Sequence, residues 1–257
     1  DGLEGLEQAF EDFAARVPST GCVVVCADDA RLAVLAERCQ RRMLTYGIDA
    51  ERASVRADDI ELDPDGSRCR VTVAIGAMAR EVRLSLPVPG RHNLRNALAA
   101  IAVGSWLEID LGVTVSALGK FSGVHRRFQY FRTTSGIDVV DDYGHHPTEI
   151  AAVLDTARLR QPSRIVVLFQ PHRYTRTARL LDRFGEVLAR ADAVVLTEVY
   201  AANESPIAAA DAAAVAAAVR RHAAIPVEVA DSLDAATDLA VSSVSSGDML
   251  VVLGAGT

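Results

Sequence analysis

The sequence lacks several features that would place it in particular classes of protein. Its 257 residues contain no uninterrupted apolar run of about 18 residues and no basic, apolar leader, so we expect neither membrane insertion nor export. Basic residues are not in excess, because the formal net charge is −7 and the isoelectric point is about 5.4. This balance argues against a general nucleic-acid-binding protein.

Cysteine is scarce, and its spacing does not predict a metal site. All four cysteines lie in the first third of the chain: Cys22, Cys26, Cys39 and Cys69. No second pair and no histidine cluster accompanies Cys22 and Cys26, so we expect no metal-binding residues among them. We interpret the four as buried, reduced thiols, which makes the cytoplasm the expected location.

A phosphate-binding P-loop is also missing. The only lysine, Lys120, follows a glycine, but Thr114 stands where the first glycine of GxxxxGK[ST] belongs. Phe121 replaces the serine or threonine that should follow the lysine. This stretch therefore does not predict a triphosphate-binding loop.

The first half of the chain mixes one strand, two helices and a series of short strands. The segment at 21–29 predicts a buried strand that ends in a polar turn, and residues 30–44 carry apolar side chains at helical spacing. Residues 50–89 alternate in short runs with a turn at 63–67, which predicts an antiparallel meander. A helix that is apolar on one side then begins near Asn93.

The second half alternates regularly between strands and helices from about Phe128. Strands are predicted at 137–142, 164–170, 193–199, 225–230 and 248–256, with helices at 147–159, 177–191, 211–222 and 233–243. Such alternation predicts right-handed crossovers and a largely parallel sheet that is covered on both faces. The fold class is therefore α/β, with one domain at 1–125 and a second at 126–257.

Polar clusters follow the first three strands of the second half. They read DDYGHH at 141–146, QPHRYTRT at 170–177 and TEVYAANESP at 197–206. Because ligands bind beyond the carboxyl ends of parallel strands, we expect these three loops to meet at one edge of the sheet. The sequence therefore predicts a functional site there.

Two of these clusters contain candidate ligand-binding groups. Arg173 and Arg176 are three residues apart, and two adjacent guanidiniums make a clamp for a carboxylate or a phosphate. A solvated basic helix start is the alternative, although a helix N-terminus disfavours cations unless an anion is present. In DDYGHH, we favour a mixed role, in which a carboxylate contacts a nucleotide and an imidazole contacts substrate. A binuclear metal site and a helix cap before Pro147 are the alternatives.

Two further motifs leave their interpretation open. Asn93 and Asn96 can share one face of a helix, where an amide could pair with adenine or simply cap the helix. The basic trio at 125–127 lies at the junction of the two halves, where an arginine could neutralise a phosphoryl group or could belong to an ordinary basic linker.

Five motifs, in this order, resemble the Mur ligases of peptidoglycan synthesis: GRHNLRNALAA, FSGVHRRFQ, VDDYGHHPTEI, QPHRYTRT and VYAANESPI. The resemblance runs from about Phe10 to the last residue. It implies the later part of a central ATP-binding domain followed by nearly all of a Rossmann-like C-terminal domain. It also implies that the UDP-binding domain, the P-loop and most magnesium ligands lie outside this sequence, so we expect the chain alone to be inactive.

The resemblance also implies a reaction. ATP converts a muramoyl carboxylate to an acyl phosphate, which an amine attacks to form an amide. The motifs agree best with the family member that joins L-alanine to UDP-N-acetylmuramate, which makes these two molecules and ATP the expected partners, with Mg²⁺ as cofactor. The alternatives are a sibling ligase that attaches a preformed peptide during wall recycling and a non-catalytic nucleotide-binding module. The oligomeric state is not predicted.

The family's functional residues are carried over position by position. The resemblance implies nucleotide contacts at His92, Asn93 and Asn96, phosphate contact at Arg127 and a nucleotide contact at Asp142, with catalytic roles for Arg127, Asp142 and His145. It implies contacts to the incoming amino acid at Tyr143, His145, Arg173 and Arg176. Asn203 stands where the family has glycine, and because asparagine tolerates a left-handed backbone we expect little change.

Overall fold

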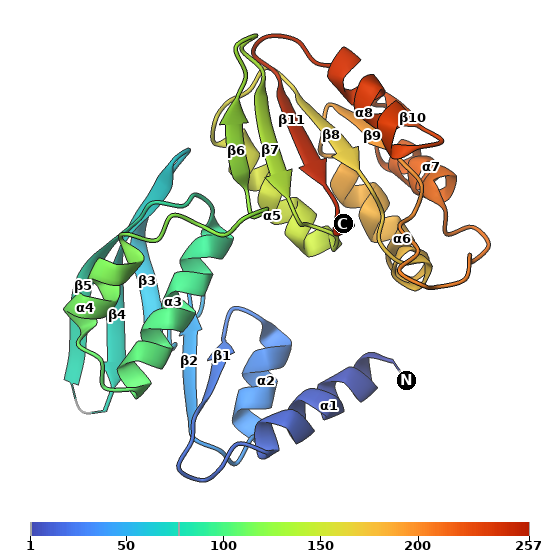
Figure 1. Ribbon diagram of the computed structural model, residues 1–257. Coiled ribbons are helices and arrows are strands. Elements are labelled where there is room, and N and C mark those ends of the chain that lie inside the picture. Colours follow the sequence, from blue (N-terminus) through green and yellow to red (C-terminus); the bar gives the residue numbers. More distant parts are fainter. Residues whose placement is uncertain (1, 77, 257) are drawn as a thin grey trace. The chain divides into compact units, whose positions relative to one another are not determined.

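The computed structural model describes residues 2–76 and 78–256, which form two compact units (Figure 1). Unit 1 extends to Ser122 and unit 2 begins at Gly123. Each unit has its own sheet, its own covering helices and its own apolar core. The α/β class predicted from the sequence is confirmed.

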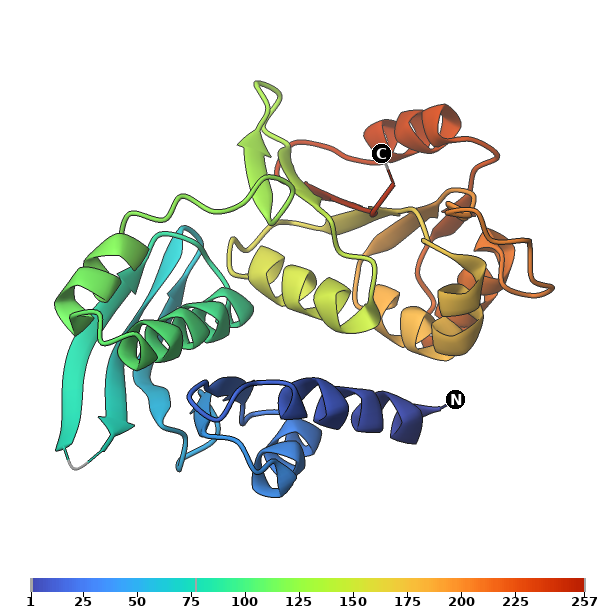
Figure 2. The same cartoon turned by 60° about the horizontal axis from the view of Figure 1, so that its bottom comes forward.

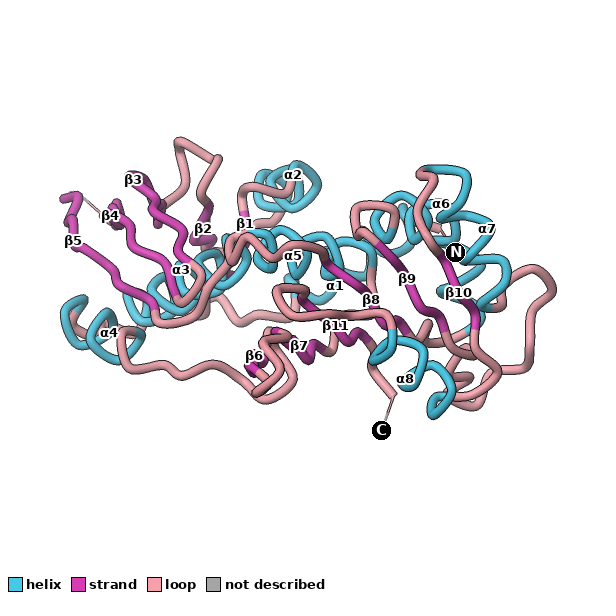
Figure 3. The backbone as a smooth tube through the Cα atoms, turned by 90° about the horizontal axis from the view of Figure 1, so that it is seen from above, coloured by secondary structure: helices cyan, strands magenta, loops and turns pink. Residues whose placement is uncertain are grey.

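Unit 1 is built on a mixed five-stranded sheet whose strands follow chain order, β1-β2-β3-β4-β5. Its strands are β1 (Val23–Cys26), β2 (Met43–Gly47), β3 (Val55–Asp63), β4 (Gly66–Ile75) and β5 (Met78–Leu86). The first three strands run parallel, and the last three form an antiparallel meander whose long strands lie side by side (Figure 3). The predicted meander is therefore confirmed.

Four helices complete unit 1: α1 (Leu3–Ala15), α2 (Ala30–Arg38), α3 (Arg91–Trp106) and α4 (Leu111–Leu118). Helix α3 buries Leu94, Leu98 and Ile101 in one apolar cluster with inward-facing residues of β3, β4 and β5. These side chains recur every three or four residues, so one face of α3 enters the core while the opposite face stays accessible.

The prediction of one helix over residues 30–44 is wrong in its second half. Helix α2 ends at Arg38 because Cys39 adopts an extended conformation, and Met43–Gly47 form β2, whose Met43 pairs with Val23. A short apolar run does not by itself distinguish a helix from a buried strand. The four cysteines form no disulfide, but the prediction that all four are buried is wrong for Cys22, Cys26 and Cys39, which are half-buried. Cys69 is buried, and burial raises the pKa of its thiol to about 11.

Unit 2 is built on a six-stranded sheet in the order β10-β9-β8-β11-β7-β6. Its strands are β6 (Gln129–Arg132), β7 (Asp138–Asp142), β8 (Ile165–Phe169), β9 (Ala193–Leu196), β10 (Val227–Val229) and β11 (Met249–Leu253). All pairings are parallel except that of β6 with β7. The sequence pattern predicted the five parallel strands but not the antiparallel edge strand β6.

Helices cover both faces of the unit 2 sheet, as predicted (Figure 2). Its helices are α5 (Pro147–Arg158), α6 (Tyr174–Leu188), α7 (Ala212–His222) and α8 (Leu233–Ser242). Along β8, Ile165 and Val167 pack in the cluster formed with α5, α6 and α7, whereas Val166 and Leu168 pack in the cluster formed with α8. This alternation follows the two-residue period of a strand.

Candidate functional site

The loops that follow β7, β8 and β9 meet at one edge of the unit 2 sheet, as the sequence predicted. The ring centroids of His145 and His172 are 5.9 Å apart, and the ring of Tyr200 stacks on that of His172 at 5.2 Å. These three residues come from three different loops. The edge therefore carries a continuous row of polar aromatic rings.

Backbone hydrogen bonds hold the second and third loops together. The amide of Arg173 donates to the carbonyl of Tyr200 at 2.8 Å, and the amide of Tyr200 donates to the carbonyl of Pro171 at 2.8 Å. The two loops thus extend the parallel pairing of β8 and β9 by one isolated bridge at His172 and Tyr200. The position of the rings is fixed by the backbone and not only by ring contact.

Asp142 is buried and holds the backbone of the first loop. Its carboxylate is only 3% exposed and accepts the amide of Phe128 at 2.7 Å through Oδ2 and the amide of Gly144 at 2.7 Å through Oδ1. Burial raises the pKa of this carboxyl, although the two amides and Arg127 oppose that rise. Asp142 therefore holds the backbone just before β6 and just after β7, and its buried side chain does not line the open edge.

His146 caps helix α5, so the capping alternative is correct for this residue. Its Nδ1 accepts the amide of Thr148 at 3.3 Å, while Glu149 Oε2 accepts the amide of His146 at 3.1 Å. Pro147 occupies the first helical position, where a missing amide hydrogen has no cost. Burial lowers the pKa of His146, which favours the neutral imidazole that this cap requires.

His145 is oriented differently and keeps one ring nitrogen for other uses. Its Nδ1 lies 3.0 Å from the carbonyl oxygen of Tyr143, and a carbonyl can only accept, so Nδ1 donates. In the neutral ring, Nε2 is then the acceptor. The ring also meets Tyr143 edge-on, with centroids 5.4 Å apart.

The two adjacent arginines before β6 have distinct surroundings. The guanidinium of Arg126 donates to the carbonyls of Gly254 at 2.7 Å and Gly256 at 3.0 Å, so it ties the start of unit 2 to the segment after β11. The side chain of Arg127 is 48% exposed and lies 3.8 Å from Glu149. Of the two, Arg127 keeps the more exposed guanidinium, whereas Arg126 is held by backbone carbonyls.

Arg173 and Arg176 lie at the start of helix α6, where Arg173 contacts the loop after β9 and Arg176 contacts the loop after β8. Arg173 NH1 lies 3.6 Å from Glu204 Oε1, and Arg176 NH1 lies 3.3 Å from the carbonyl oxygen of His172. The helix begins at Tyr174, three residues before its predicted start, so Arg176 lies in the first turn. Burial, followed by the charge of Arg176, lowers the pKa of His172 and favours its neutral form.

Three of the predicted nucleotide-binding residues, His92, Asn93 and Asn96, lie on the first two turns of α3 in unit 1. Gly90, at φ 96°, precedes the helix, and the Asn93 amide group donates to the carbonyl of Pro89 at 2.8 Å. Asn93 therefore fixes the entry to the helix, whereas Asn96 is exposed. His92 is half-buried one turn before Asn96 on the same side of the helix.

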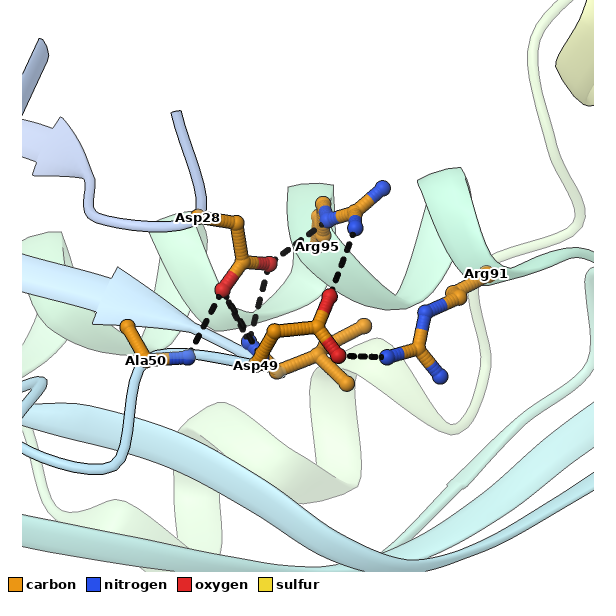
Figure 4. Close-up of polar contacts among 6 residues, drawn as sticks. Asp28, Asp49, Ala50, Arg91 and Arg95 are labelled. Atoms are coloured by element: carbon orange, nitrogen blue, oxygen red, sulfur yellow. Dashed lines mark hydrogen bonds and ion pairs between the residues drawn. The ribbon is translucent and has the colours of Figure 1, made fainter. Parts of the chain in front are cut away.

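A buried ion pair that the sequence analysis missed holds this end of α3 (Figure 4). Asp28, whose side chain is only 6% exposed, accepts Arg95 Nε at 2.7 Å. It also accepts the amides of Ile48, Asp49 and Ala50 at 2.8 to 3.0 Å. Burial alone would raise the pKa of this carboxyl, but Arg95 and the amides outweigh burial and hold that pKa below its usual range.

Asp49 extends this network to the first residue of the helix. Its carboxylate lies 3.2 Å from Arg95 NH2 and also pairs with Arg91, so two carboxylates bind two arginines that are one turn apart on α3. Asp28 follows β1 and Asp49 follows β2. Each aspartate lies in a polar turn that follows a parallel strand. The sequence pattern predicted the turn that contains Asp28, but not the turn that contains Asp49.

The described residues offer no metal site. No three histidine, cysteine, aspartate or glutamate side chains among them lie close enough together to hold an ion. In the same part of the chain, no helix combines the length and the hydropathy needed to cross a bilayer.

Comparison with known families assigns both units. Residues 126–256 match the model described as the Mur ligase glutamate ligase domain, and residues 1–104 match the Mur ligase middle domain. The chain belongs to the Mur ligase family. This assignment confirms the resemblance that the five sequence motifs carry.

Individual Mur ligases extend this result. Two curated relatives are both called UDP-N-acetylmuramate–L-alanine ligase: that of Solibacter usitatus is 44% identical over 99% of this chain, and that of Nitrosomonas eutropha is 40% identical over 98%. The matches cover 53% and 54% of these relatives, so the chain spans about half the length of the curated relatives it matches.

Solved Mur ligase structures share the fold. The UDP-N-acetylmuramate–alanine ligase of Thermotoga maritima aligns with all of this chain and 53% of its own, at 29% identity and a TM-score of 0.73. A murein peptide ligase of Psychrobacter arcticus aligns with 99% of this chain and 52% of its own, at 21% identity and a TM-score of 0.71. At that identity the second likeness concerns the fold alone.

Proposed function

We propose that the protein containing this chain is an ATP-dependent ligase that joins L-alanine to UDP-N-acetylmuramate in peptidoglycan synthesis. The names of the relatives at 40–44% identity support this reaction. The observation in this chain that carries it is the edge of unit 2, where Arg173, Arg176, His145 and Tyr200 come together from three loops. The likeness to the murein peptide ligase of Psychrobacter arcticus does not support the preformed-peptide alternative, because at 21% identity it concerns the fold alone.

The proposed chemistry forms an amide through an acyl phosphate. ATP transfers its γ-phosphoryl group to the muramoyl carboxylate, and ADP leaves. The amine nitrogen of alanine then attacks the carbonyl carbon, the carbon–oxygen bond to phosphate breaks, and phosphate leaves with the electron pair. One proton must be removed from the amino group, so a proton acceptor near the amine would assist this step.

We assign the amino-acid side of the reaction to unit 2. Arg173 and Arg176 bind the carboxylate of alanine, because guanidiniums form charge-assisted hydrogen bonds with carboxylates. His145 accepts a proton from the amino group through Nε2, since its Nδ1 is already a donor to the Tyr143 carbonyl. Tyr143 supports this imidazole by its edge-on contact and belongs to the same substrate-binding set.

We assign the nucleotide side to α3 and to the entry segment of unit 2. Asn96 and His92 contact the adenine or the ribose from the accessible face of α3, and Asn93 fixes the start of that helix. Arg127 neutralises phosphate charge, for which its exposed guanidinium is suited. Asp142 acts on the nucleotide indirectly, since its two carboxylate oxygens already hold backbone amides.

No three potential metal-binding side chains lie together among the described residues, so this chain would give ATP-bound magnesium at most one or two ligands. ATP would bring the metal mainly to residues outside this chain, as the family resemblance implies. We therefore propose that this chain alone does not catalyse ligation, and that the full-length protein acts in the cytoplasm, where UDP-activated sugars and ATP meet.

Steady-state kinetics of the full-length protein test this assignment. Arg176→Ala should raise the Michaelis constant for L-alanine by about 30-fold or more, because a desolvated charge-assisted contact is worth on the order of 2–4 kcal/mol. The Michaelis constant for ATP should change little. Asn96→Ala should show the reverse pattern.

The control is Arg179→Ala, which removes an exposed arginine from the same helix and should leave both constants unchanged. Loss of ATP binding in Arg176→Ala with normal alanine dependence would show that the two sides are misassigned. Turnover supported by a tripeptide but not by L-alanine would show that the alternative ligase is correct.

A further inference from the structure

The two arginines proposed to bind the substrate carboxylate lie at the start of helix α6, and the residue at the capping position provides no capping side chain. Arg173 precedes the helix at φ 73°, a left-handed conformation, and its side chain makes no capping hydrogen bond. A helix N-terminus carries partial positive charge and leaves its first amides without intrahelical partners. Two arginines at this end add to the positive charge, so the start of α6 requires an anion from elsewhere.

Glu204, from the loop after β9, supplies this anion. Its Oε2 accepts the amide of Thr175 at 2.9 Å, and its Oε1 accepts the Thr175 hydroxyl at 2.7 Å. The same Oε1 lies 3.6 Å from Arg173 NH1. The Glu204 side chain is only 19% exposed, so one carboxylate both caps the helix and pairs with the arginine before it.

The loop around Glu204 is built to place this carboxylate. Ala202 and Asn203 both adopt positive φ angles, 47° and 67°, and the Glu204 amide donates to the carbonyl of Ala201 at 3.0 Å. The left-handed backbone expected at Asn203 is confirmed. Earlier in the same loop, Tyr200 fixes Arg173 through a backbone hydrogen bond and His172 through ring stacking.

We infer that Glu204 is a positioning residue for binding of the amino-acid carboxylate. It acts through Arg173, because it orients the guanidinium of Arg173 and partly balances its charge. This inference rests on the proposed function. A guanidinium has five donors, so Arg173 can keep Glu204 as a partner and still bind a substrate carboxylate. Without Glu204, Arg173 would lose its fixed direction, and the first turn of α6, which carries Arg176, would lose its cap.

Kinetics of the full-length protein with L-alanine as the varied substrate test the inference. Glu204→Ala should raise the Michaelis constant for L-alanine by about tenfold, the scale of one charge-assisted hydrogen bond, and leave that for ATP unchanged. Glu204→Gln, which can still accept from Thr175, should have a smaller effect. Glu186→Gln, an exposed carboxylate on the same helix, is the matched control and should change neither constant.

A double-mutant cycle separates this role from simple stabilisation of the fold. If Glu204 acts through Arg173, Glu204→Ala should have little further effect on the alanine constant in an Arg173→Ala background. The same fold-change in both backgrounds, or an equal rise in the constant for ATP, would overturn the inference. If Glu204→Ala does not fold, the cycle is run with Glu204→Gln. Absence of alanine-dependent turnover in the unmutated enzyme would instead refute the proposed function.

Discussion

Replacing Asp28 by alanine should destabilise unit 1 more than any other single removal of a charge there. The carboxylate accepts three backbone amides from residues 48–50 and the Nε of Arg95, and its side chain is 6% exposed. Alanine would leave these donors without a partner. Gly47 also depends on this packing, because a Cβ there would lie 2.4 Å from Asp28 Oδ1.

The expected magnitude follows from the environment of each donor. An unsatisfied buried amide costs about 1–3 kcal/mol, and residues 48–50 are only half-buried or exposed, so we take about 1 kcal/mol for each of the three. Arg95 keeps Asp49 as a partner and is 34% exposed, so its loss adds little. The sum, about 3 kcal/mol, matches the lower range for removing one partner of a buried ion pair.

Tryptophan fluorescence during urea unfolding measures this effect in unit 1 alone. The sequence has a single tryptophan, Trp106, at the end of α3, and unit 2 has none. With a slope of about 2 kcal/mol per molar urea, a loss of 3 kcal/mol lowers the midpoint by about 1.5 M. The matched control is Asp49→Ala, whose 61% exposed side chain should contribute less than about 1 kcal/mol.

Equal midpoints for Asp28→Ala and Asp49→Ala would refute the reasoning, because burial of the carboxylate would then have no energetic consequence. Asp28→Asn separates charge from shape. Its single oxygen could still accept the three amides that now bind Oδ1, but its NH2 group would face the Nε of Arg95, so we expect a smaller loss than for alanine.

Three further predictions concern unit 2. Gly185→Ala should destabilise unit 2 by about 1–3 kcal/mol despite the better helix propensity of alanine, because the new Cβ would lie 2.7 Å from the backbone of Ala218. Thermal unfolding followed by circular dichroism measures this loss, and an unchanged midpoint would contradict the prediction. The lowered pKa values of His146 and His172 mean that the folded chain binds fewer protons than the unfolded chain, so the free energy of unfolding should fall as the pH drops below about 6.5. Replacing both histidines by asparagine should reduce the change in melting temperature between pH 7.5 and pH 5.5. Arg126→Ala should lower the melting temperature, because it removes two hydrogen bonds to backbone carbonyls. Arg127→Ala removes a more exposed side chain, so it should leave the melting temperature unchanged and reduce turnover by the full-length enzyme. The opposite pattern would show that Arg126 serves the reaction and Arg127 the fold.

The fold of unit 2 was predictable because its signal is local. Each inner strand is a short apolar run whose residues are buried on both faces, and each helix repeats its apolar residues at helical spacing. The edge strand β6 gave no such signal, since Phe131 and Arg132 are exposed and only one side of the strand is paired. In unit 1, β2 was mistaken for the end of a helix because its two apolar residues continued the helical spacing of α2.

The candidate site was predictable as a location but not as a set of contacts. The polar loops could be placed at one edge because the carboxyl ends of parallel strands always meet there. Asp142 is more buried than its neighbour Asp141 because of the two-residue period of β7, which turns Asp142 to the same side as the buried Val140. The start of α6 could not be located, because its cap comes from Glu204, 29 residues after Thr175.

One arrangement recurs at three arginines, two of which, Arg127 and Arg173, we propose to bind nucleotide or substrate. Arg95, Arg127 and Arg173 each lie beside a carboxylate that also accepts backbone amides: Asp28, Glu149 and Glu204, respectively. The amides fix the carboxylate, and the carboxylate in turn fixes the guanidinium, so each arginine is placed before any ligand binds. Because the charges of Arg127 and Arg173 are partly balanced in advance, a ligand must offer better geometry than the resident carboxylate, which favours carboxylates and phosphates that bind a guanidinium through two oxygens.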